Sequence, residues 1–185
     1  MGHSVWGYFF AKLSGRRLRG EIPAYLAFLT GILPDFDLYF GRLGLVHQTY
    51  THSLLFLGPI IAILIAKFGA RGVALSVGIL SHLLTDGLVG AIPIFYPASS
   101  PNVGLGLGIP SAADTLLEDG MLLVVLLYMH QNGDTRLLLK KDTSNLRLLV
   151  PLLAIVSLSL LFSQDNNILL LTYAFSRKAL GAISI

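Results

Sequence analysis

Long apolar segments separated by short polar turns dominate the chain. Five stretches are apolar over a length close to that of a membrane-spanning helix: Ile22–Leu33, Ser53–Phe68, Val73–Phe95, Leu116–Met129 and Leu146–Phe162. Several are shorter than the roughly 20 residues that cross a hydrocarbon core, which predicts tilted or half-length helices around a pocket. Residues 3–14 predict a further short helix that ends at Gly15. The pattern predicts a single all-α domain over residues 1–185, a polytopic membrane bundle of about five to seven helices, some of them short.

Proline, glycine and serine mark the predicted ends of these helices. The helix that begins near Pro23, a favourable first-turn residue, is expected to end at Pro34, and a polar loop follows up to Tyr50. Residues 96–111 are rich in proline, glycine and serine, which predicts an ordered loop or a lid rather than a spanning segment. The apolar segment 167–185 is expected either to lie on the membrane or to return across it.

The composition supports a membrane location. Hydrophobic residues make up 54% of the chain and charged residues 12%, with a mean hydropathy of +0.74. A soluble domain of this length does not need so much apolar surface. The chain also contains no cysteine, which excludes disulfides and thiolate metal ligands.

Basic residues gather in alternate loops. Successive helices cross a membrane in opposite directions, so alternate loops lie on the same side, and an excess of lysine and arginine marks the cytoplasmic side. The high pI of about 9.3 therefore indicates a membrane topology, and nucleic acid is not an expected partner. The residues concerned are Lys12, Arg16, Arg17 and Arg19, then Lys67 and Arg71, then Arg136, Lys140, Lys141 and Arg147.

Ionisable residues inside or at the ends of apolar helices are costly, and they mark functional sites by default. In the alternating topology they all fall on the side opposite the basic loops, toward the outer leaflet. Independent structural roles would not require that convergence, so a shared site near one leaflet is expected. His130 falls on the cytoplasmic side and is excluded. The candidate residues are His3, Asp35, Asp37, His47, His52, His82, Asp86 and Glu118.

His82 and Asp86 are four residues apart, so both side chains point from one face of a helix. An imidazole and a carboxylate in this relation can bind one metal ion, or the carboxylate can orient a ligating imidazole. The alternative is a hydrogen-bonded polar pair that fastens neighbouring helices. For Glu118, the alternative to a ligand is a first-turn acid that the helix dipole favours.

Asp35 and Asp37 follow Pro34. In an extended segment residues i and i+2 point the same way, so both carboxylates are expected to face one site. The alternative is a turn at a helix end with two solvated acids. His52 lies at the start of an apolar helix, which favours a functional role, whereas His47 has an ordinary loop histidine as its alternative.

In order along the chain, these motifs resemble the YdjM-like family, whose members are described as LexA-regulated, membrane-bound, predicted metal-dependent hydrolases. The resemblance runs from residue 2 to about residue 125. The chain departs from the family pattern at Gln48-Thr49, where Arg-Gly is usual, and at Leu38, where an acid–histidine pair often follows. The motifs are Gly2-His3, Leu33-Pro34-Asp35-Phe36-Asp37, His47-(four residues)-His52-Ser53, Ser81-His82-Leu83-Leu84-Thr85-Asp86, Ile94-Phe95-Tyr96-Pro97 and Leu117-Glu118.

The resemblance implies a metal-dependent hydrolase. Histidines mixed with carboxylates suit zinc, with manganese or iron as alternatives, and eight ligands are too many for one tetrahedral ion, so two or three ions are expected. Asp37 or His47 is expected to be a further ligand or the general base. The expected metal ligands are His3, Asp35, His52, His82, Asp86 and Glu118.

The ligand order is also similar, more loosely, to zinc-dependent phospholipase C and P1-type nucleases. The expected reaction is therefore hydrolysis of a phosphate ester on a lipid or lipid-linked substrate by a metal-activated water. Arg42 is a candidate phosphate contact, with a plain surface arginine as the alternative. The sequence leaves the oligomeric state open.

Two other functions compete with this reading. A metal-ion or proton-coupled transporter also uses intramembrane histidine and aspartate, but it needs a site near the midplane that both sides can reach. The helices are expected to hold no ionisable residue in their cytoplasmic half, which disfavours a transporter. The second competitor is a non-catalytic scaffold in which a metal ion only fastens helices.

Overall fold

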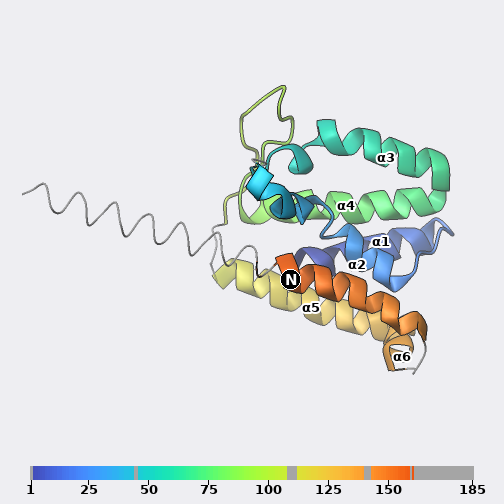
Figure 1. The fold of residues 1–185 in the computed structure, drawn as a ribbon. Helices are drawn as coiled ribbons and strands as arrows, with labels where there is room; N and C mark the ends of the chain where they lie inside the picture. Colours follow the sequence, from blue (N-terminus) through green and yellow to red (C-terminus); the bar gives the residue numbers. More distant parts are fainter. Residues whose placement is uncertain (1, 44–45, 108–111, 140–142, 159, 161–185) are drawn as a thin grey trace, which may run out of the picture.

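The computed structural model describes residues 2–43, 46–107, 112–139, 143–158 and 160 (Figure 1). The side chains of residues 42–43, 112–115, 117–118, 137–139 and 143–145 lie outside the description, as does the predicted membrane-associated segment 167–185. Among the described residues the only β pairing is an isolated bridge between Ile92 and Val103. The predicted all-α class is therefore confirmed for this part of the chain.

Helix α1 (Gly2–Arg17) contacts α2 (Ala24–Thr30), α4 (Ala70–Val89) and α5 (Ala112–Gln131). Its Tyr8 and Ala11 are fully buried, and they form a core with apolar side chains of the neighbouring helices. Glycines allow the close crossing of α1 and α2: a Cβ added to Gly7 would lie 2.3 Å from Gly31 Cα, and one added to Gly31 would lie 2.0 Å from the His3 carbonyl oxygen. This crossing brings the first turn of α1 next to the end of α2.

Helices α3 (Leu54–Phe68) and α4 form an antiparallel hairpin (Figure 1). Ser53 caps α3 by accepting a hydrogen bond from the Leu55 amide at 3.1 Å. Gly69, with φ of 55°, makes the turn between the two helices, a conformation that glycine adopts without steric cost. Helix α4 ends at Val89, before the predicted limit at Phe95, because Gly90 and the prolines beyond it favour a loop.

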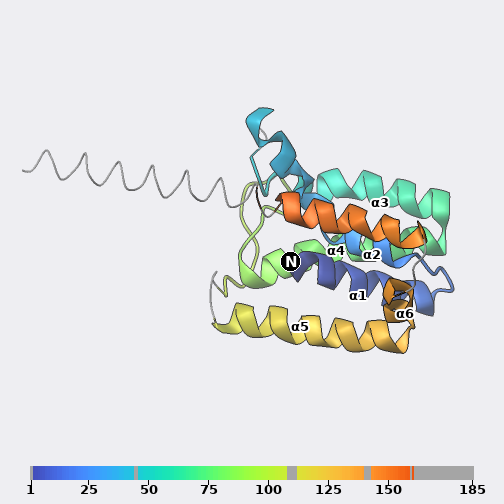
Figure 2. The same ribbon diagram turned by 60° about the horizontal axis from the view of Figure 1, so that its bottom comes forward.

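The remaining helices complete the bundle. Helix α5 leads through a short turn to α6 (Asp134–Leu139), which is followed by η3 (Thr143–Leu148) and an apolar helix over Leu146–Leu158. Figures 1 and 2 both show this last helix running beside α2, and η3 contacts α2. The short 3₁₀ segments η1 (Pro34–Leu43) and η2 (Tyr50–His52) connect α2 to α3.

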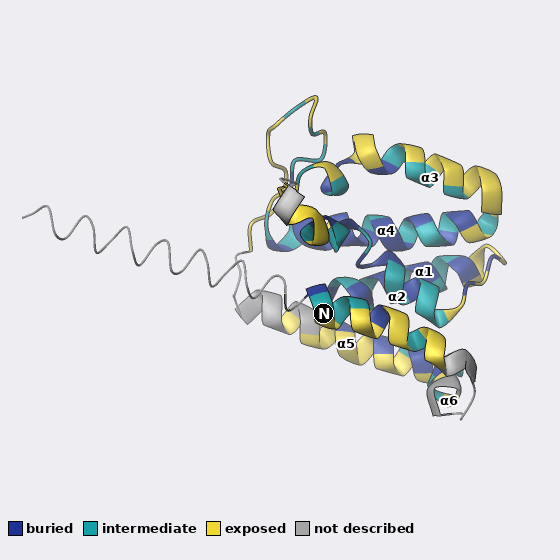
Figure 3. Cartoon of the chain, viewed as in Figure 1, coloured by how far each residue is buried: buried dark blue, intermediate teal, exposed yellow. Residues whose placement is uncertain are grey.

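Exposed residues follow the outer faces of α3, α5 and the last helix (Figure 3), and many of them are large and apolar. On a soluble protein, so large an apolar surface marks an interaction site or a membrane contact. The exposed residues include Leu54, Leu55, Phe56, Ile63 and Ile65 on α3, Leu122, Leu123, Leu126 and Leu127 on α5, and Leu149, Val150, Leu152, Leu153 and Val156 on the last helix.

Among the described residues, α4 is the one helix long and apolar enough to cross a membrane by length and composition. It is also 61% buried inside the protein. Helix Leu54–Phe68 and helix Leu146–Leu158 are apolar but shorter, and α5 has the length but carries Asp114, Glu118 and Asp119 in its first half. The polytopic arrangement therefore stays a prediction.

The two ends of the bundle differ in chemistry. Figure 1 shows the α1–α2, α3–α4 and α5–α6 turns at one end, and η1, η2 and the loop over residues 90–107 at the other. The first end, called here the basic end, carries the positive charges of the alternate loops: Arg16, Arg17, Arg19, Lys67, Arg71 and Arg136.

Lys12 corrects one prediction. Gly15 does not end the first helix: α1 continues to Arg17 because Gly15 serves for close packing, with an added Cβ only 2.9 Å from the Gly20 carbonyl oxygen. Lys12 lies inside α1, within the helix predicted over residues 3–14, and not in the basic loop with which it was also grouped; its Nζ pairs with the buried Asp134 at 3.0 Å. The expectation that the helices hold no ionisable residue in the half nearest the basic end is wrong.

Candidate functional site

Histidines and aspartates from separate segments meet at the end of the bundle opposite the basic end. Segments far apart in the sequence supply them: the first turn of α1, the segments η1 and η2 with the loop between them, and the second half of α4. His52 and His82 are fully buried. Burying such groups is costly unless they are paired or bind a metal. We call these residues the histidine–aspartate cluster: His3, Asp35, Asp37, His47, His52, His82 and Asp86.

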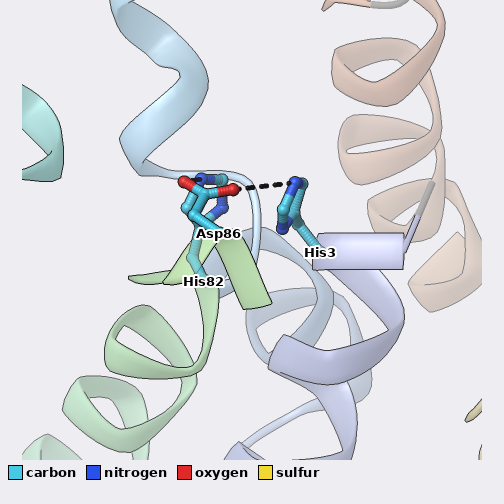
Figure 4. A group of neighbouring side chains, drawn as sticks. All are labelled: His3, His82 and Asp86. Atoms are coloured by element: carbon cyan, nitrogen blue, oxygen red, sulfur yellow. Dashed lines mark ion pairs between the residues drawn. The ribbon is translucent and has the colours of Figure 1, made fainter. Parts of the chain in front are cut away.

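The α4 pair forms the base of the cluster. His82 and Asp86 lie one helical turn apart, with 3.3 Å between His82 Nε2 and Asp86 Oδ2. Figure 4 shows both side chains pointing from α4 toward His3 on α1. The spacing that predicts one shared helix face thus places imidazole and carboxylate side by side in the protein interior.

Five of the six separations among four atoms of the cluster are close to those of a tetrahedron, and we call this set the tetrahedron: His52 Nε2, His82 Nε2, Asp35 Oδ1 and Asp86 Oδ2. The two Nε2 atoms lie 3.0 Å apart, and each lies 3.3 Å from Asp86 Oδ2. Asp35 Oδ1 lies 3.5 Å from His52 Nε2 and 3.3 Å from His82 Nε2. Ligands held at roughly 2.0–2.1 Å around a tetrahedral zinc ion stand about 3.3–3.4 Å apart. The two imidazoles therefore have the spacing of metal ligands to each other and to each carboxylate. Two groups of three residues also bring one ligand atom each within 4.8 Å of one another: His3, His82 and Asp86, and Asp35, His47 and His52.

The hydrogen bonds of the two buried imidazoles set their tautomers. His82 Nδ1 lies 2.7 Å from the Gly31 carbonyl oxygen, which only accepts, so Nδ1 carries the proton. His52 Nδ1 lies 3.0 Å from Thr51 Oγ1, whose single proton goes to Asp37 Oδ2 at 2.6 Å, so His52 also donates from Nδ1. With Nδ1 protonated, each Nε2 faces the carboxylate oxygens, as a donor when the ring is charged and with its lone pair when the ring is neutral.

Asp86 Oδ2 supports the same conclusion. It is buried and has no hydrogen-bond donor, although two imidazole nitrogens lie 3.3 Å away. A buried carboxylate oxygen without a donor is costly and calls for an explanation such as a bound ion. A cation between the imidazole nitrogens and this oxygen would supply the missing partner.

His3 extends the cluster toward the other oxygen of Asp86. Thr85 Oγ1 donates to the His82 carbonyl oxygen at 2.8 Å, so it accepts from His3 Nδ1 at 2.8 Å. His3 Nε2 then faces Asp86 Oδ1 at 3.3 Å (Figure 4). The His3 ring also stacks on the His82 ring, with 4.1 Å between the centroids. Asp86 therefore presents Oδ2 to His52 and His82 and Oδ1 to His3.

Asp37 and His47 form an outer layer. His47 Nδ1 donates to Asp37 Oδ1 at 2.9 Å, and His47 Nε2 lies 4.0 Å from Asp35 Oδ1. Asp37 is 3% exposed and accepts two further hydrogen bonds, from the Gln48 amide at 3.3 Å and from Thr51 Oγ1 at 2.6 Å. Asp37 thus orients His47 directly and His52 through Thr51.

The segment that holds Asp35 and Asp37 is not extended as predicted. The amides of Asp35 and Phe36 bond to the carbonyl oxygens of Ile32 and Leu33, each at 3.2 Å, and the turns continue as η1. With three residues per turn, side chains two positions apart diverge. Asp35 therefore faces the tetrahedron, and Asp37 faces the segment that contains His47 and Thr51.

The electrostatic surroundings keep the η1 carboxylates ionised. Burial acts to raise the pKa of Asp35, but hydrogen bonding to His52 and His82 outweighs it and lowers the pKa below its usual range. For Asp37, hydrogen bonds from His47 and Thr51 likewise overcome burial and lower the pKa. Burial acts to lower the pKa of His47, and the hydrogen bond to Asp37 overcomes it and raises the pKa. Negative charge on the carboxylates favours a bound cation.

Two predicted site residues lie outside the described part of the chain. The backbones of Arg42 and Glu118 belong to η1 and α5, but their side chains are not described. His130, which the topology excludes, is exposed in the last turn of α5.

Three groups that orient the imidazoles were not predicted. Thr51 and Thr85 had a sequence signal, because each directly precedes a predicted ligand, His52 or Asp86. The Gly31 carbonyl oxygen had no sequence signal. It is a backbone acceptor 51 residues from His82, and a pattern of side chains does not indicate backbone contacts.

Comparison with known proteins places these observations in a family. The family model described as YdjM inner membrane protein matches residues 1–168, which includes every residue of the histidine–aspartate cluster. This confirms the family resemblance of the sequence motifs. No curated protein and no solved structure matches the chain.

Proposed function

The chain belongs to the YdjM inner membrane protein family, and we propose that it is a membrane-bound metal-dependent hydrolase that cleaves a phosphate ester of a lipid or lipid-linked substrate. The observation that carries the proposal is the close approach of His52 Nε2, His82 Nε2, Asp35 Oδ1 and Asp86 Oδ2, in which each imidazole nitrogen lies 3.0–3.5 Å from the other three atoms. Asp86 Oδ2 is buried and makes no hydrogen bond among the described residues.

The ligand chemistry favours zinc. Two neutral imidazoles and two carboxylates form a borderline to hard set that suits zinc, with manganese or iron as alternatives. Each imidazole donates its second N–H to a fixed oxygen, an arrangement that orients metal-ligating histidines in proteins. A bound divalent ion would lower the pKa of a water molecule and polarise a phosphoryl oxygen.

A second ion would be held by His3 and Asp86. Asp86 directs Oδ2 to His82 Nε2 and Oδ1 to His3 Nε2, so each of its oxygens could serve a different ion. Asp35 Oδ1 in turn lies 4.0 Å from His47 Nε2. Glu118 is a proposed further ligand. The positions of His3 and Asp86 support a count of two ions, and a third ion is proposed if His47 is also a ligand.

Other residues near the proposed metal site have proposed roles in proton transfer, substrate binding and orientation. Asp37 holds the Nδ1 proton of His47, so His47 presents Nε2 toward Asp35 and is placed either to ligate or to accept a proton from an attacking water. Arg42 is the proposed contact for the substrate phosphate. Asp37, locked by three donors, acts through His47 and Thr51.

The proposed topology is multi-pass, with the basic end in the cytoplasm and the cluster toward the outer leaflet. The basic turns share one end of the bundle and the cluster lies at the other (Figure 1), as the positive-inside rule requires of a site on the outer side. The exposed apolar faces of α3, α5 and the last helix (Figure 3) supply the lipid contact.

Aromatic side chains near the cluster favour a lipid substrate. Tyr39, Phe40, Tyr50 and Phe95 are each 41–53% exposed, and they come from η1, η2 and the loop that follows α4. Exposed aromatic residues are enriched where a membrane protein meets the headgroup region. A metal centre at that depth lies level with the phosphate groups of the lipids.

A metal-ion or proton-coupled transporter is the second candidate. The buried pair of Lys12 and Asp134 favours it, because this pair places ionisable groups in the half of the bundle next to the basic end. A transporter would move the ion across a vesicle membrane, whereas a hydrolase would retain it and release phosphate or a phosphorylated headgroup.

Metal content tests the proposal. We expect elemental mass spectrometry of detergent-purified protein, prepared without chelator, to show two or more equivalents of zinc or manganese. His82→Ala and Asp86→Ala should lose it, whereas His130→Ala, an exposed histidine distant from the cluster, should keep it. A screen of lipid phosphoesters with the loaded protein should then show hydrolysis that both cluster variants lack.

The outcomes separate the functions. Absence of stoichiometric metal from the parent protein would overturn the hydrolase proposal. Metal without hydrolysis, together with uptake of the ion into vesicles, would establish the transporter. Stoichiometric metal with neither activity would leave the scaffold, in which the ion only fastens α1, η1, η2 and α4.

A further inference from the structure

A second polar group of residues lies at the basic end, away from the histidine–aspartate cluster. It surrounds a pocket of about 180 Å³, room for several water molecules because each occupies roughly 30 Å³. We call it the basic-end pocket. It opens between α1, the turn after α1 and the α5–α6 turn, and its lining residues are Lys12, Arg16, Glu21, Ile22, Gln131, Asn132 and Asp134.

The negative charge of Asp134 is already matched within the protein. Lys12 Nζ lies 3.0 Å from Asp134 Oδ2 and 3.4 Å from Oδ1, and it also donates to the Ile22 carbonyl oxygen at 3.3 Å. Tyr8 donates its hydroxyl proton to Asp134 Oδ2 at 2.5 Å. Asp134 therefore has its hydrogen-bonding and charge partners without a ligand.

Arg16 and Asn132 have hydrogen-bond donors beyond those used in the contact between them. One nitrogen of the Arg16 guanidinium, Nη1, donates to Asn132 Oδ1, and a guanidinium carries five N–H groups in all. That contact fixes the Asn132 amide, whose Nδ2 is buried and has no acceptor. A buried donor without an acceptor calls for a partner. Glu21, the other lining carboxylate, is an exposed residue.

We propose that the basic-end pocket binds a phosphate-type anion through Arg16 and Asn132. A planar guanidinium forms paired, charge-assisted hydrogen bonds with phosphate oxygens. The Asn132 amide adds a buried donor beside Tyr8 that makes no hydrogen bond in the described part of the chain by distance and angle. Among the described contacts, Arg16 bonds to an uncharged amide oxygen, whereas Lys12 pairs with a carboxylate.

The surroundings favour the headgroup of an anionic phospholipid as the source of this phosphate. The pocket lies among the basic turns, and clusters of lysine and arginine at a membrane surface attract anionic lipids. Leu18 follows α1, and Leu126 and Leu127 lie on α5; all three are 48–57% exposed and offer apolar surface for acyl chains. The proposal goes beyond the hydrolase function and is independent of it, because the cluster lies at the other end of the bundle.

Native mass spectrometry of the full-length protein in mild detergent tests this inference. After incubation with phosphatidylglycerol or phosphatidylcholine, we expect one phosphatidylglycerol to be retained and phosphatidylcholine to be lost. Arg16→Gln and Asn132→Leu should each weaken retention by roughly tenfold, the loss that one charge-assisted hydrogen bond implies. Arg71→Gln, an exposed arginine of the α3–α4 turn, removes the same charge outside the pocket and should retain the lipid as the parent protein does.

Inorganic phosphate distinguishes the two sources of the ligand. Displacement of phosphatidylglycerol by millimolar inorganic phosphate supports recognition of the lipid headgroup, and binding of inorganic phosphate without lipid retention supports the same anion site with a soluble ligand. Equal losses in Arg71→Gln and Arg16→Gln would overturn the proposal in favour of diffuse surface charge. So would unaltered anion binding in both pocket variants. An unchanged unfolding temperature in all three variants serves as the check that they fold.

Discussion

The Nε2 atoms of His52 and His82 lie 3.0 Å apart in the interior of the bundle, and each ring donates its other N–H away from that contact. With both rings neutral, neither nitrogen has a proton to give the other. A cation between them, held also by the carboxylates of Asp35 and Asp86, resolves the conflict. The predictions below follow from this relationship and from the packing that maintains it.

Removal of the Thr51 hydroxyl should weaken the metal centre without removing a ligand. Thr51 accepts from His52 Nδ1 and donates to Asp37, so Thr51→Val frees the imidazole to rotate. Loss of such an outer partner typically lowers metal affinity by roughly 10–100-fold. Competition with a chromophoric chelator measures the affinity. Thr49→Val, whose hydroxyl bonds only to the Val46 carbonyl oxygen among the described contacts, should bind metal as the parent does.

His3 should distinguish one ion from two. Its Nε2 faces Asp86 Oδ1, whereas the tetrahedron uses Asp86 Oδ2. We expect His3→Ala to lose one equivalent of metal and keep one, and His82→Ala to lose both because His82 contributes to the tetrahedron and stacks on His3. Elemental mass spectrometry against protein concentration gives the stoichiometry. Full retention of metal in His3→Ala would refute the second ion.

The pair of Asp37 and His47 should give the metal-free protein a defined pH window of stability. The pKa of Asp37 is lowered, so its contribution is present above the unfolded value of 3.8 and is lost as the pH falls through the folded pKa. The pKa of His47 is raised, so its contribution is present below 6.5 and is lost as the pH rises through the folded pKa. The pair therefore stabilises most between those two values.

Thermal unfolding of chelator-treated protein, followed from about pH 3 to about pH 8, checks this window. Asp37→Asn removes the charge that raises the pKa of His47, so the difference in unfolding temperature between parent and variant should be largest between pH 3.8 and pH 6.5. A difference that does not vary with pH would show that Asp37 acts only through packing.

The close crossing of α1 and α2 should not tolerate a side chain at Gly31. A Cβ there would lie 2.0 Å from the His3 carbonyl oxygen, so Gly31→Ala should push the two helices apart. We expect a loss of roughly 1–3 kcal/mol in the free energy of unfolding, the usual cost of overpacking, and weaker metal binding because His3 and the Gly31 carbonyl oxygen both move.

Gly120→Ala provides the matched control for this substitution. Gly120 lies inside α5, and an added Cβ meets nothing within 4 Å beyond its own stretch of helix. Since alanine favours a helix over glycine by about 1 kcal/mol, this variant should unfold at the same temperature as the parent or higher. Equal destabilisation by the two substitutions would contradict the role of the α1–α2 crossing.

The absence of native cysteine makes the topology open to direct measurement. Single cysteines at Arg19 and Arg71 mark the basic end, and one at Ser99 marks the loop beside the cluster. In intact cells, a membrane-impermeant maleimide should label Ser99→Cys alone, and disruption of the membrane should expose Arg19→Cys and Arg71→Cys. The reverse pattern would place the metal centre at the inner leaflet.

The all-α class, the start of α3 and the shared helix face of the α4 pair were predictable because they depend on local patterns. Apolar runs and their breakers fixed α3 within a residue of its predicted start, and the four-residue spacing of His82 and Asp86 placed both on one face of α4. Likewise, the order of the motifs along the chain was enough to identify the family, which the match over residues 1–168 confirms.

Contacts between distant segments were decided only by the tertiary structure. The sequence could not separate Asp35, which faces the tetrahedron, from Asp37, which orients the imidazoles, because the choice between a 3₁₀ turn and an extended strand depended on packing around Pro34. It also grouped Lys12 with a basic loop, because its partner Asp134 lies 122 residues away. Side-chain patterns indicate the helix face on which a residue lies. The partner that the residue contacts there depends on how the helices cross. Close packing at glycines, such as Gly7 of α1 and Gly31 at the end of α2, sets that crossing.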